Sequence, residues 1–130
     1  MAGQTGRRLT GERDLVRLLQ GMAPRLYDDR YAIRPLGQGE GAPASAFALI
    51  AEEEGRTLIA AEAGGEWARI SLTVHSDLTA VGLTAALSRA LADAGISANV
   101  VAGLYHDHIF VPWARRHDAL AALASLGEIV

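Results

Sequence analysis

The segment from Trp67 to Pro112 constrains the fold of this 130-residue chain more than any other part of the sequence. Near its start, Ile70, Leu72 and Val74 alternate with polar residues, which is the period-2 pattern of a strand with one buried face. A glycine-bearing turn and a long amphipathic stretch follow, and two β-rich segments close the run. The predicted order is therefore strand, helix, strand, tight turn and strand.

Two amphipathic stretches predict the helices of this region. Residues 79–94 carry apolar side chains at helical spacing, and Gly95 supplies the glycine that commonly follows a helix. Residues 113–126 predict a second helix, and residues 128–130 predict the start of a last edge strand. With both helices on one face of an antiparallel sheet, the expected fold is α+β and follows the ferredoxin-like βαββαβ plan.

The first half of the chain is less regular. Residues 14–22 predict a helix that Gly21 and Pro24 end. Three short segments predict strands, residues 30–36, 46–51 and 57–61. Pro35 is expected to push the first of them toward a sheet edge, since proline cannot donate to a ladder. The Gly64-Gly65 pair predicts a boundary between an N-terminal half, residues 1–64, and a C-terminal half, residues 65–130.

Composition excludes several classes of protein. The chain has no cysteine, so disulfides, thiolate catalysis and cysteine-based zinc sites are excluded. Twelve basic and 15 acidic residues give a net charge of −3, without the basic patch of a typical nucleic-acid binder. No apolar run approaches the ~18 residues of a membrane-spanning helix, and the N-terminal residues do not resemble a signal peptide. We therefore expect a cytoplasmic protein that binds neither nucleic acid nor membranes.

Glycines at positions 37, 39 and 41 lie in the polar segment GQGEGAPAS. A phosphate-binding loop would need a following Lys-Ser or Lys-Thr pair and a helix behind a buried strand, and neither is present. The segment is better explained as a solvent-exposed hairpin loop.

The side chains that could bind a ligand or take part in catalysis lie at one edge of the predicted sheet. The first and third strands of this plan are antiparallel neighbours, so His75 is expected near His106, Asp107 and His108. The first helix begins at the same edge, and its first backbone N–H groups can bind a small anion.

Several interpretations of the His106-Asp107-His108 run remain open. With His75 as a third ligand it would be a metal site, and alone it could supply an acid–base catalyst, although no nucleophile accompanies it. A ligand-recognition turn, in which Asp107 meets an ammonium or another donor, is favoured over both. A purely structural polar turn is the remaining alternative. Asn99, a polar residue in an apolar strand, could orient a ligand or lie at a strand edge.

Specific segments resemble the ACT domain family, most closely its short bacterial members that stand alone without an attached enzyme. The matching segments are ISLTVHS, AVGLTAAL, AGISANVV, YHDHIFVP and the upstream EEEGRTLIAAEA. The resemblance covers residues 9–126 and extends to the tandem ACT-like halves of the eukaryotic cytosolic arginine sensor and the regulatory part of aspartate kinases. It implies two ACT-like halves packed together, the first of them degenerate.

The resemblance also implies a ligand site at the interface of ACT units. The turn before the first helix would supply the backbone contacts, which fall here on Leu78, Ala80, Val81 and Gly82. The family's acidic residue falls on Asp107, and its asparagine falls on Asn99. Together with Asp107, His75 or His108 would contact the cationic or polar end of the ligand.

The expected function is therefore that of a regulatory protein that binds a small molecule, usually an amino acid in this family. We expect no catalytic activity and no cofactor. A homodimer is expected, because the open sheet face and the strand edges need cover. The alternatives are an assembly module without a ligand and a metal-binding protein that uses His75, His106 and His108.

Overall fold

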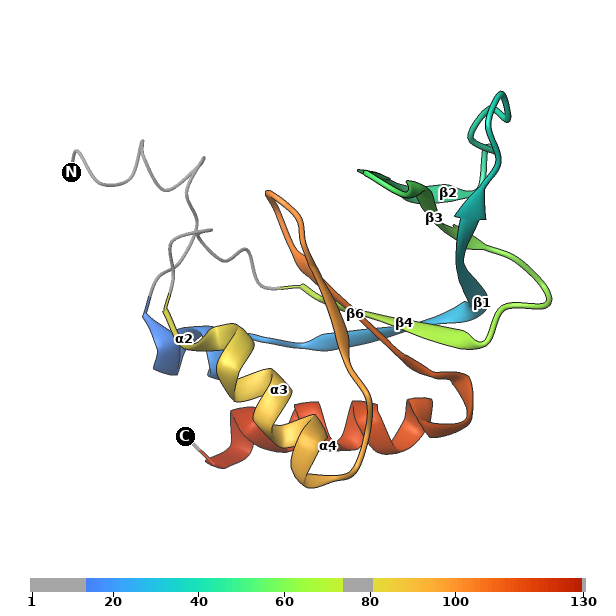
Figure 1. Cartoon of the computed structure of the whole chain (residues 1–130). Coiled ribbons are helices and arrows are strands. Elements are labelled where there is room, and N and C mark those ends of the chain that lie inside the picture. Colours follow the sequence, from blue (N-terminus) through green and yellow to red (C-terminus); the bar gives the residue numbers. More distant parts are fainter. Residues whose placement is uncertain (1–13, 74–80, 130) are drawn as a thin grey trace, which may run out of the picture.

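The computed structural model of the chain describes residues 14–73 and 81–129 (Figure 1). The helices are α2 (Leu15–Gln20), α3 (Leu83–Asp93), the short 3₁₀ helix η1 (Trp113–Arg115) and α4 (Arg116–Ile129). The strands are β1 (Pro24–Leu36), β2 (Ala46–Glu52), β3 (Gly55–Ala61), β4 (Trp67–Leu72), β5 (Asn99–Ala102) and β6 (Asp107–Pro112).

The six strands form one antiparallel sheet in the order β2-β3-β1-β4-β6-β5. Strands β4, β5 and β6 are the first, second and third strands of the predicted βαββ run, and the third lies beside the first as expected. The place of the fourth strand, on the other side of β4, is filled by β1. The α+β, ferredoxin-like fold is confirmed, and the two halves of the chain share a single sheet.

The predicted last strand at residues 128–130 was wrong. Helix α4 continues to Ile129, and Val130 lies outside the described residues. The position beside β4 that such a strand would occupy is already taken by β1, so the C-terminal residues are free to continue the helix.

Strand β1 is longer and more central than the sequence indicates. Its first part pairs with β4, and its second part pairs with β3, so the prediction of an edge strand was wrong. The pairing with β4 ends at Tyr31, however, and Pro35 pairs with β3 alone. Proline is tolerated there because β1 has only one neighbour at that position.

A bulge in β1 brings several residues of that strand opposite a single residue of β4. Leu26 pairs with Ile70 and Arg30 with Ala68, so residues 27–29 lie opposite Arg69 alone. Bulges of this kind bend a strand and increase its twist. Figure 1 shows the result, in which β1 runs beside β4 and then turns up toward β2 and β3.

The main hydrophobic core lies between the helices and one face of the sheet. The buried residues of β4 and β6 on this face contact α2, α3 and α4, and they are Ala68, Ile70, Leu72, Ile109 and Val111. Helix α3 contributes Leu83, Leu87 and Leu91, which recur at helical spacing as its sequence predicts. The helix begins at Leu83, later than expected, because Gly82 has a left-handed φ of 99°.

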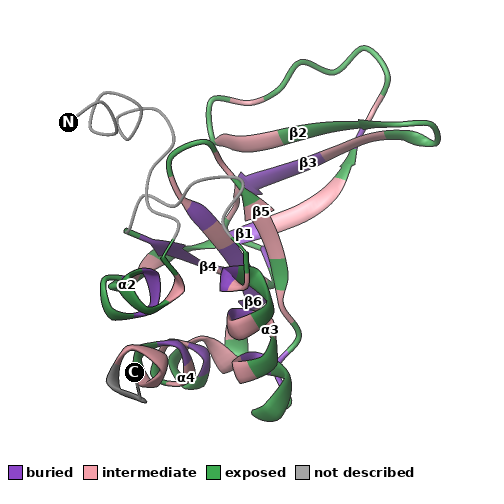
Figure 2. Cartoon of the chain, turned by 90° about the vertical axis from the view of Figure 1, so that its left-hand side faces the viewer, coloured by how far each residue is buried: buried purple, intermediate pink, exposed green. Residues whose placement is uncertain are grey.

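The other face of the sheet is partly covered by the N-terminal half itself. Figure 2 shows the β2–β3 hairpin on the side of the sheet opposite the three α-helices. Phe47 of β2 and Ile59 of β3 form a small apolar cluster with Tyr31 and Phe110. The N-terminal strands therefore extend the sheet and bend over its open face.

The glycine-rich segment at residues 37–45 joins β1 to β2, which lie on either side of β3. It is therefore a crossover and not the hairpin loop that the sequence suggested. The hairpin is formed by β2 and β3, where Glu52 pairs with Gly55 across the turn.

The two adjacent glycines before β4 provide a test of this packing. A Cβ added at Gly65 would lie 2.3 Å from the carbonyl carbon and oxygen of Tyr31, whereas one added at Gly64 would meet nothing within 4 Å. The backbone of Tyr31 is held by β3 and β4 and cannot easily move. Gly65→Ala should therefore lower the free energy of unfolding by about 1–3 kcal/mol. Gly64→Ala should change it by less than about 0.5 kcal/mol. Urea unfolding followed by circular dichroism measures both, and equal effects would contradict the packing.

Candidate functional site

The ligand turn expected from the sequence lies only partly within the described residues. His75, Leu78 and Ala80 fall within residues 74–80, outside them, so their roles remain predictions. Val81 is 84% exposed and directly precedes Gly82, the N-cap of α3. No side chain caps the start of this helix.

The packing around Gly82 and its backbone conformation both favour glycine at this position. A Cβ at this position would lie 3.1 Å from Cδ2 of Leu15, and its φ of 99° is unfavourable for other residues. A side chain of α2 therefore approaches this glycine closely. This contact connects the N-terminal half of the chain to the start of α3.

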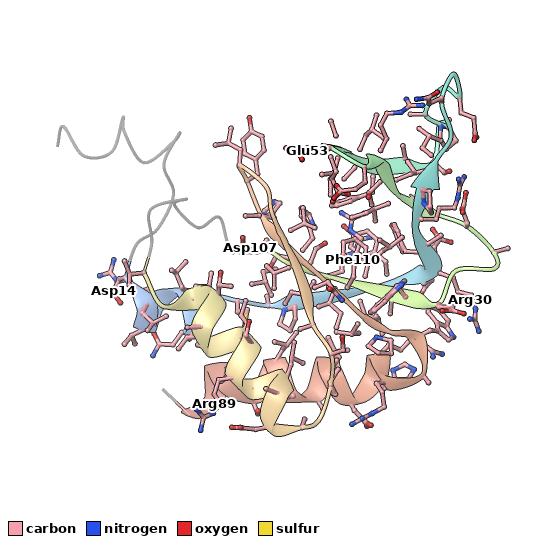
Figure 3. All side chains as sticks on the ribbon, in the orientation of Figure 1. Asp14, Arg30, Glu53, Arg89, Asp107 and Phe110 are labelled. Carbon is pink, nitrogen blue, oxygen red and sulfur yellow. The ribbon has the colours of Figure 1, made fainter. Side chains whose placement is uncertain are left out.

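The other expected ligand residues lie on different faces of the sheet. Asp107 is the first residue of β6 and is only 7% exposed, and strand alternation places it on the helix-covered face with Ile109. His108 lies on the open face. Asn99 is exposed and pairs with Phe110 on that same open face. The structure therefore does not bring Asp107 together with His108 and Asn99, and Figure 3 shows Asp107 at the end of β6 away from Phe110.

The metal alternative has no support within residues 14–73 and 81–129. No three His, Cys, Asp or Glu side chains in these ranges gather as a metal site. Nδ1 of His108 is engaged by Ser71 at 2.7 Å, and the His108 ring meets Phe47 edge-on with 4.8 Å between centroids. Since His75 lies outside the described residues, the three-histidine site remains a prediction.

The open face carries a cluster that sequence reasoning missed, here called the arginine cluster. It consists of Arg25, Tyr27, Tyr31, Phe47, Arg69, Ser71 and His108. The strand register builds it, because Arg25 pairs with Ser71, and Ser71 pairs with His108. Arg69 lies two residues before Ser71 on the same face of β4, opposite the bulge that carries Tyr27.

Arg69 lies at the centre of this cluster. Its guanidinium carbon is 4.0 Å from the ring centroid of Tyr27 and 4.4 Å from that of Phe47. Contacts of this kind stabilise a cation on an aromatic face. Its Nη1 donates to the hydroxyl of Tyr31 at 3.1 Å, and its Nε donates to Ser71 Oγ at 3.2 Å. These contacts fix the guanidinium in a partly buried position.

The hydrogen-bond network also determines the state of His108. Because Ser71 Oγ accepts from Arg69, its own proton is available to His108 Nδ1 at 2.7 Å. We therefore assign the neutral tautomer with the proton on Nε2. Burial, the charge of Arg69 and the charge of His106 lower the pKa of His108 to about 4. At pH 7 the positive charge of the cluster resides on the arginines alone.

A sequence signal for part of this cluster was present. In β4, Arg69 and Ser71 alternate with the apolar residues Ile70 and Leu72, so the sequence places both polar residues on the face opposite the core. Arg25 and Phe47 could not be connected to them. Phe47 approaches only because the bend of β1 carries β2 over the open face, and Arg25 joins the cluster through Tyr27 of the bulge.

The His108 imidazole is expected to titrate near pH 4, well below the value of about 6.5 for an unfolded chain. Between these pH values the unfolded state binds more protons, so stability should fall as the pH drops from about 6.5 to about 4. An NMR titration of the imidazole protons measures the pKa, with His108→Asn to assign the signal. A pKa near 6.5 would contradict the arrangement.

Two arginine variants separate the causes of this shift. Arg69→Gln removes the nearby positive charge and should raise the pKa of His108. Arg89→Gln removes an exposed arginine that pairs with Asp93 on α3 and should leave it unchanged.

Comparisons with known proteins cover both halves of the chain. One ACT domain family model matches residues 62–125, and a second matches residues 10–75. No curated protein matches the sequence. No helix within the described residues is long and apolar enough to cross a membrane.

Three solved structures illustrate the likeness. A Vibrio cholerae protein of unknown function, described as a possible transport protein, is 40% identical with a TM-score of 0.72, over 87% of this chain and 95% of that one. An Agrobacterium tumefaciens protein is 17% identical with a TM-score of 0.65, over 80% and 87% of the two chains. The ligand-free regulatory subunit of aspartate kinase from Thermus thermophilus is 13% identical with a TM-score of 0.62, over 82% and 97%. The last two share the fold alone. Because two ACT domain models match the chain and together cover residues 10–125, this chain belongs to the ACT domain family.

Proposed function

We propose that this protein is a non-catalytic regulator that binds an amino acid. ACT domains are regulatory modules that bind small molecules. The observation that carries the proposal is the pair of ACT matches, which together span residues 10–125. The division into halves at residues 64 and 65 is part of the proposal.

In this proposal the ligand carboxylate meets backbone N–H groups at the turn that includes Leu78, Ala80, Val81 and Gly82. Two features support the choice. Helix α3 has 11 residues and begins without a side-chain cap, and its dipole favours a negative charge at that end. Asp107 begins β6 at the sheet edge where β4 ends, and its carboxylate would meet the ligand ammonium. His75 would assist, whereas His108 and Asn99 face the other side of the sheet.

Ligand binding would be transmitted to the N-terminal half through α2. Leu15 of α2 packs against Gly82, so a change at the turn would reach this contact first. Self-association would use the edge strands β2 and β5. Leu49 and Ile50 on β2 are 47% and 42% exposed, which supports a homodimer that covers this edge. The ligand would then act by shifting an assembly equilibrium.

An assembly module without a ligand is the second candidate. The contact between Leu15 and Gly82 favours it, because this contact explains the glycine without a ligand. The two candidates differ in whether any amino acid stabilises the folded protein.

Thermal denaturation in the presence of each of the twenty amino acids distinguishes them. A ligand at a hundredfold excess over its dissociation constant should stabilise the protein by about 2.7 kcal/mol. If no amino acid raises the melting temperature, the proposed function is wrong and the assembly module is favoured.

A pair of aspartate variants tests the proposed site. Asp107→Asn removes the charge that would meet the ligand ammonium and should weaken binding at least tenfold. Asp93→Asn changes an exposed carboxylate at the far end of α3 and should leave binding unchanged. Because Asp107 is buried, circular dichroism and the ligand-free melting temperature must show that the variant folds. A folded Asp107→Asn protein with full affinity would contradict the site.

A further inference from the structure

The arginine cluster places two cationic side chains against one aromatic ring on the open face of the sheet. The guanidinium carbons of Arg25 and Arg69 lie 4.3 and 4.0 Å from the ring centroid of Tyr27. Arg25 is exposed, and Arg69 is partly buried beneath Phe47. Two positive charges therefore contact the same ring, and solvent reaches at least one of them.

No carboxylate within the described residues forms an ion pair with either guanidinium group. The ion pairs of this part of the chain join Arg34 to Glu62, Arg89 to Asp93 and Arg115 to Asp118. Neither Arg25 nor Arg69 takes part in them. The acidic residues that follow Tyr27 in β1, Asp28 and Asp29, line a different pocket with Trp113.

The cluster retains hydrogen-bond donors. A guanidinium has five N–H groups. Those of Arg69 that bond to Ser71 and Tyr31 account for two, and a longer contact of 3.4 Å reaches His108. One N–H on each terminal nitrogen remains. The hydroxyl of Tyr31 accepts from Arg69 and can donate its own proton, and Arg25 makes no hydrogen bond within the described residues.

The aromatic contacts and hydrogen bonds of Arg69 offset part of the hydration that it loses on burial, but they supply no negative charge. The neighbouring histidine adds no further charge at neutral pH because it is held in its neutral form. Arginine forks are suited to bidentate contacts with carboxylate and phosphate oxygens.

We propose that Arg25, Arg69 and Tyr31 form a binding site for a doubly charged oxyanion, supplied by a phosphate group or by a dicarboxylate. The two guanidinium groups neutralise the charge, and the Tyr31 hydroxyl completes the set of donors. The site lies on the open face of the sheet, whereas Asp107 of the proposed amino-acid site lies on the helix-covered face. The two sites are therefore independent and can be tested separately.

Calorimetric titration of the full chain with inorganic phosphate and with succinate tests the proposal, using sodium chloride at matched ionic strength as the reference. Binding of at least one anion above this reference is expected. Arg25→Gln and Arg69→Gln should each weaken it at least tenfold. Arg89→Gln, which changes an exposed arginine on α3, should bind as the unaltered protein does. Phosphate binding alone indicates a phosphate-bearing ligand, and succinate binding alone indicates a dicarboxylate.

The His108 imidazole gives a second measurement within the same site. A bound oxyanion offsets the charge of Arg69, so the pKa of His108 should rise when the anion binds. The Arg25→Gln variant should lose this response, and because Arg25 is exposed its loss should not disturb the fold. The proposal is wrong if neither anion binds above the chloride reference. It is also wrong if Arg89→Gln weakens binding as much as Arg25→Gln, since that result indicates unspecific screening.

Discussion

The pairing of β1 with both β3 and β4 is the interaction on which the rest of the structure depends. It joins two halves of the chain into one sheet, and it supplies the strand that a βαββ run needs beside its first strand. Without β1, the strand β4 would be an unprotected edge with unpaired backbone groups. The helices α2, α3 and α4 then cover a sheet face whose central residues come from β4 and β6.

Strand β1 also determines which side chains gather on the open face of the sheet. The bulge at residues 27–29 brings Tyr27 against Arg69, and the bend beyond it carries β2 and β3 over Phe110. Contacts of the Phe110 ring with Tyr31 and Phe47 hold this bend. One face of β4 is therefore a conventional core, and the other combines aromatic rings with cationic side chains. The physical difference between the faces separates the proposed amino-acid site from the arginine cluster.

Local pattern was sufficient to predict β4, β5, β6 and the two long helices of the C-terminal half, but not where α3 begins or α4 ends. The alternation around Ile70 and Leu72 gave β4, and the apolar stripe with Gly95 gave α3. The antiparallel pairing of β4 with β6 followed from the order of these elements. The resemblance of YHDHIFVP and AVGLTAAL to ACT domains gave the family.

The errors arose where distant parts of the chain meet. The place of β1 beside β4 cannot be read from the residues of β1, and it decided that residues 128 and 129 are helical. Asp107 and His108 are separated by strand alternation, because β6 already begins at Asp107 and the two residues do not lie in a turn. Arg25 and Phe47 contact the surroundings of Arg69 only after the bulge and the bend have formed.

The role of β1 is tested most directly by the folding of residues 65–130 expressed without the preceding chain. This fragment, which lacks β1, should show no cooperative unfolding transition and no dispersed amide spectrum. The full chain should show both. A fragment that unfolds cooperatively with a native-like spectrum would contradict the claim that β1 completes the fold.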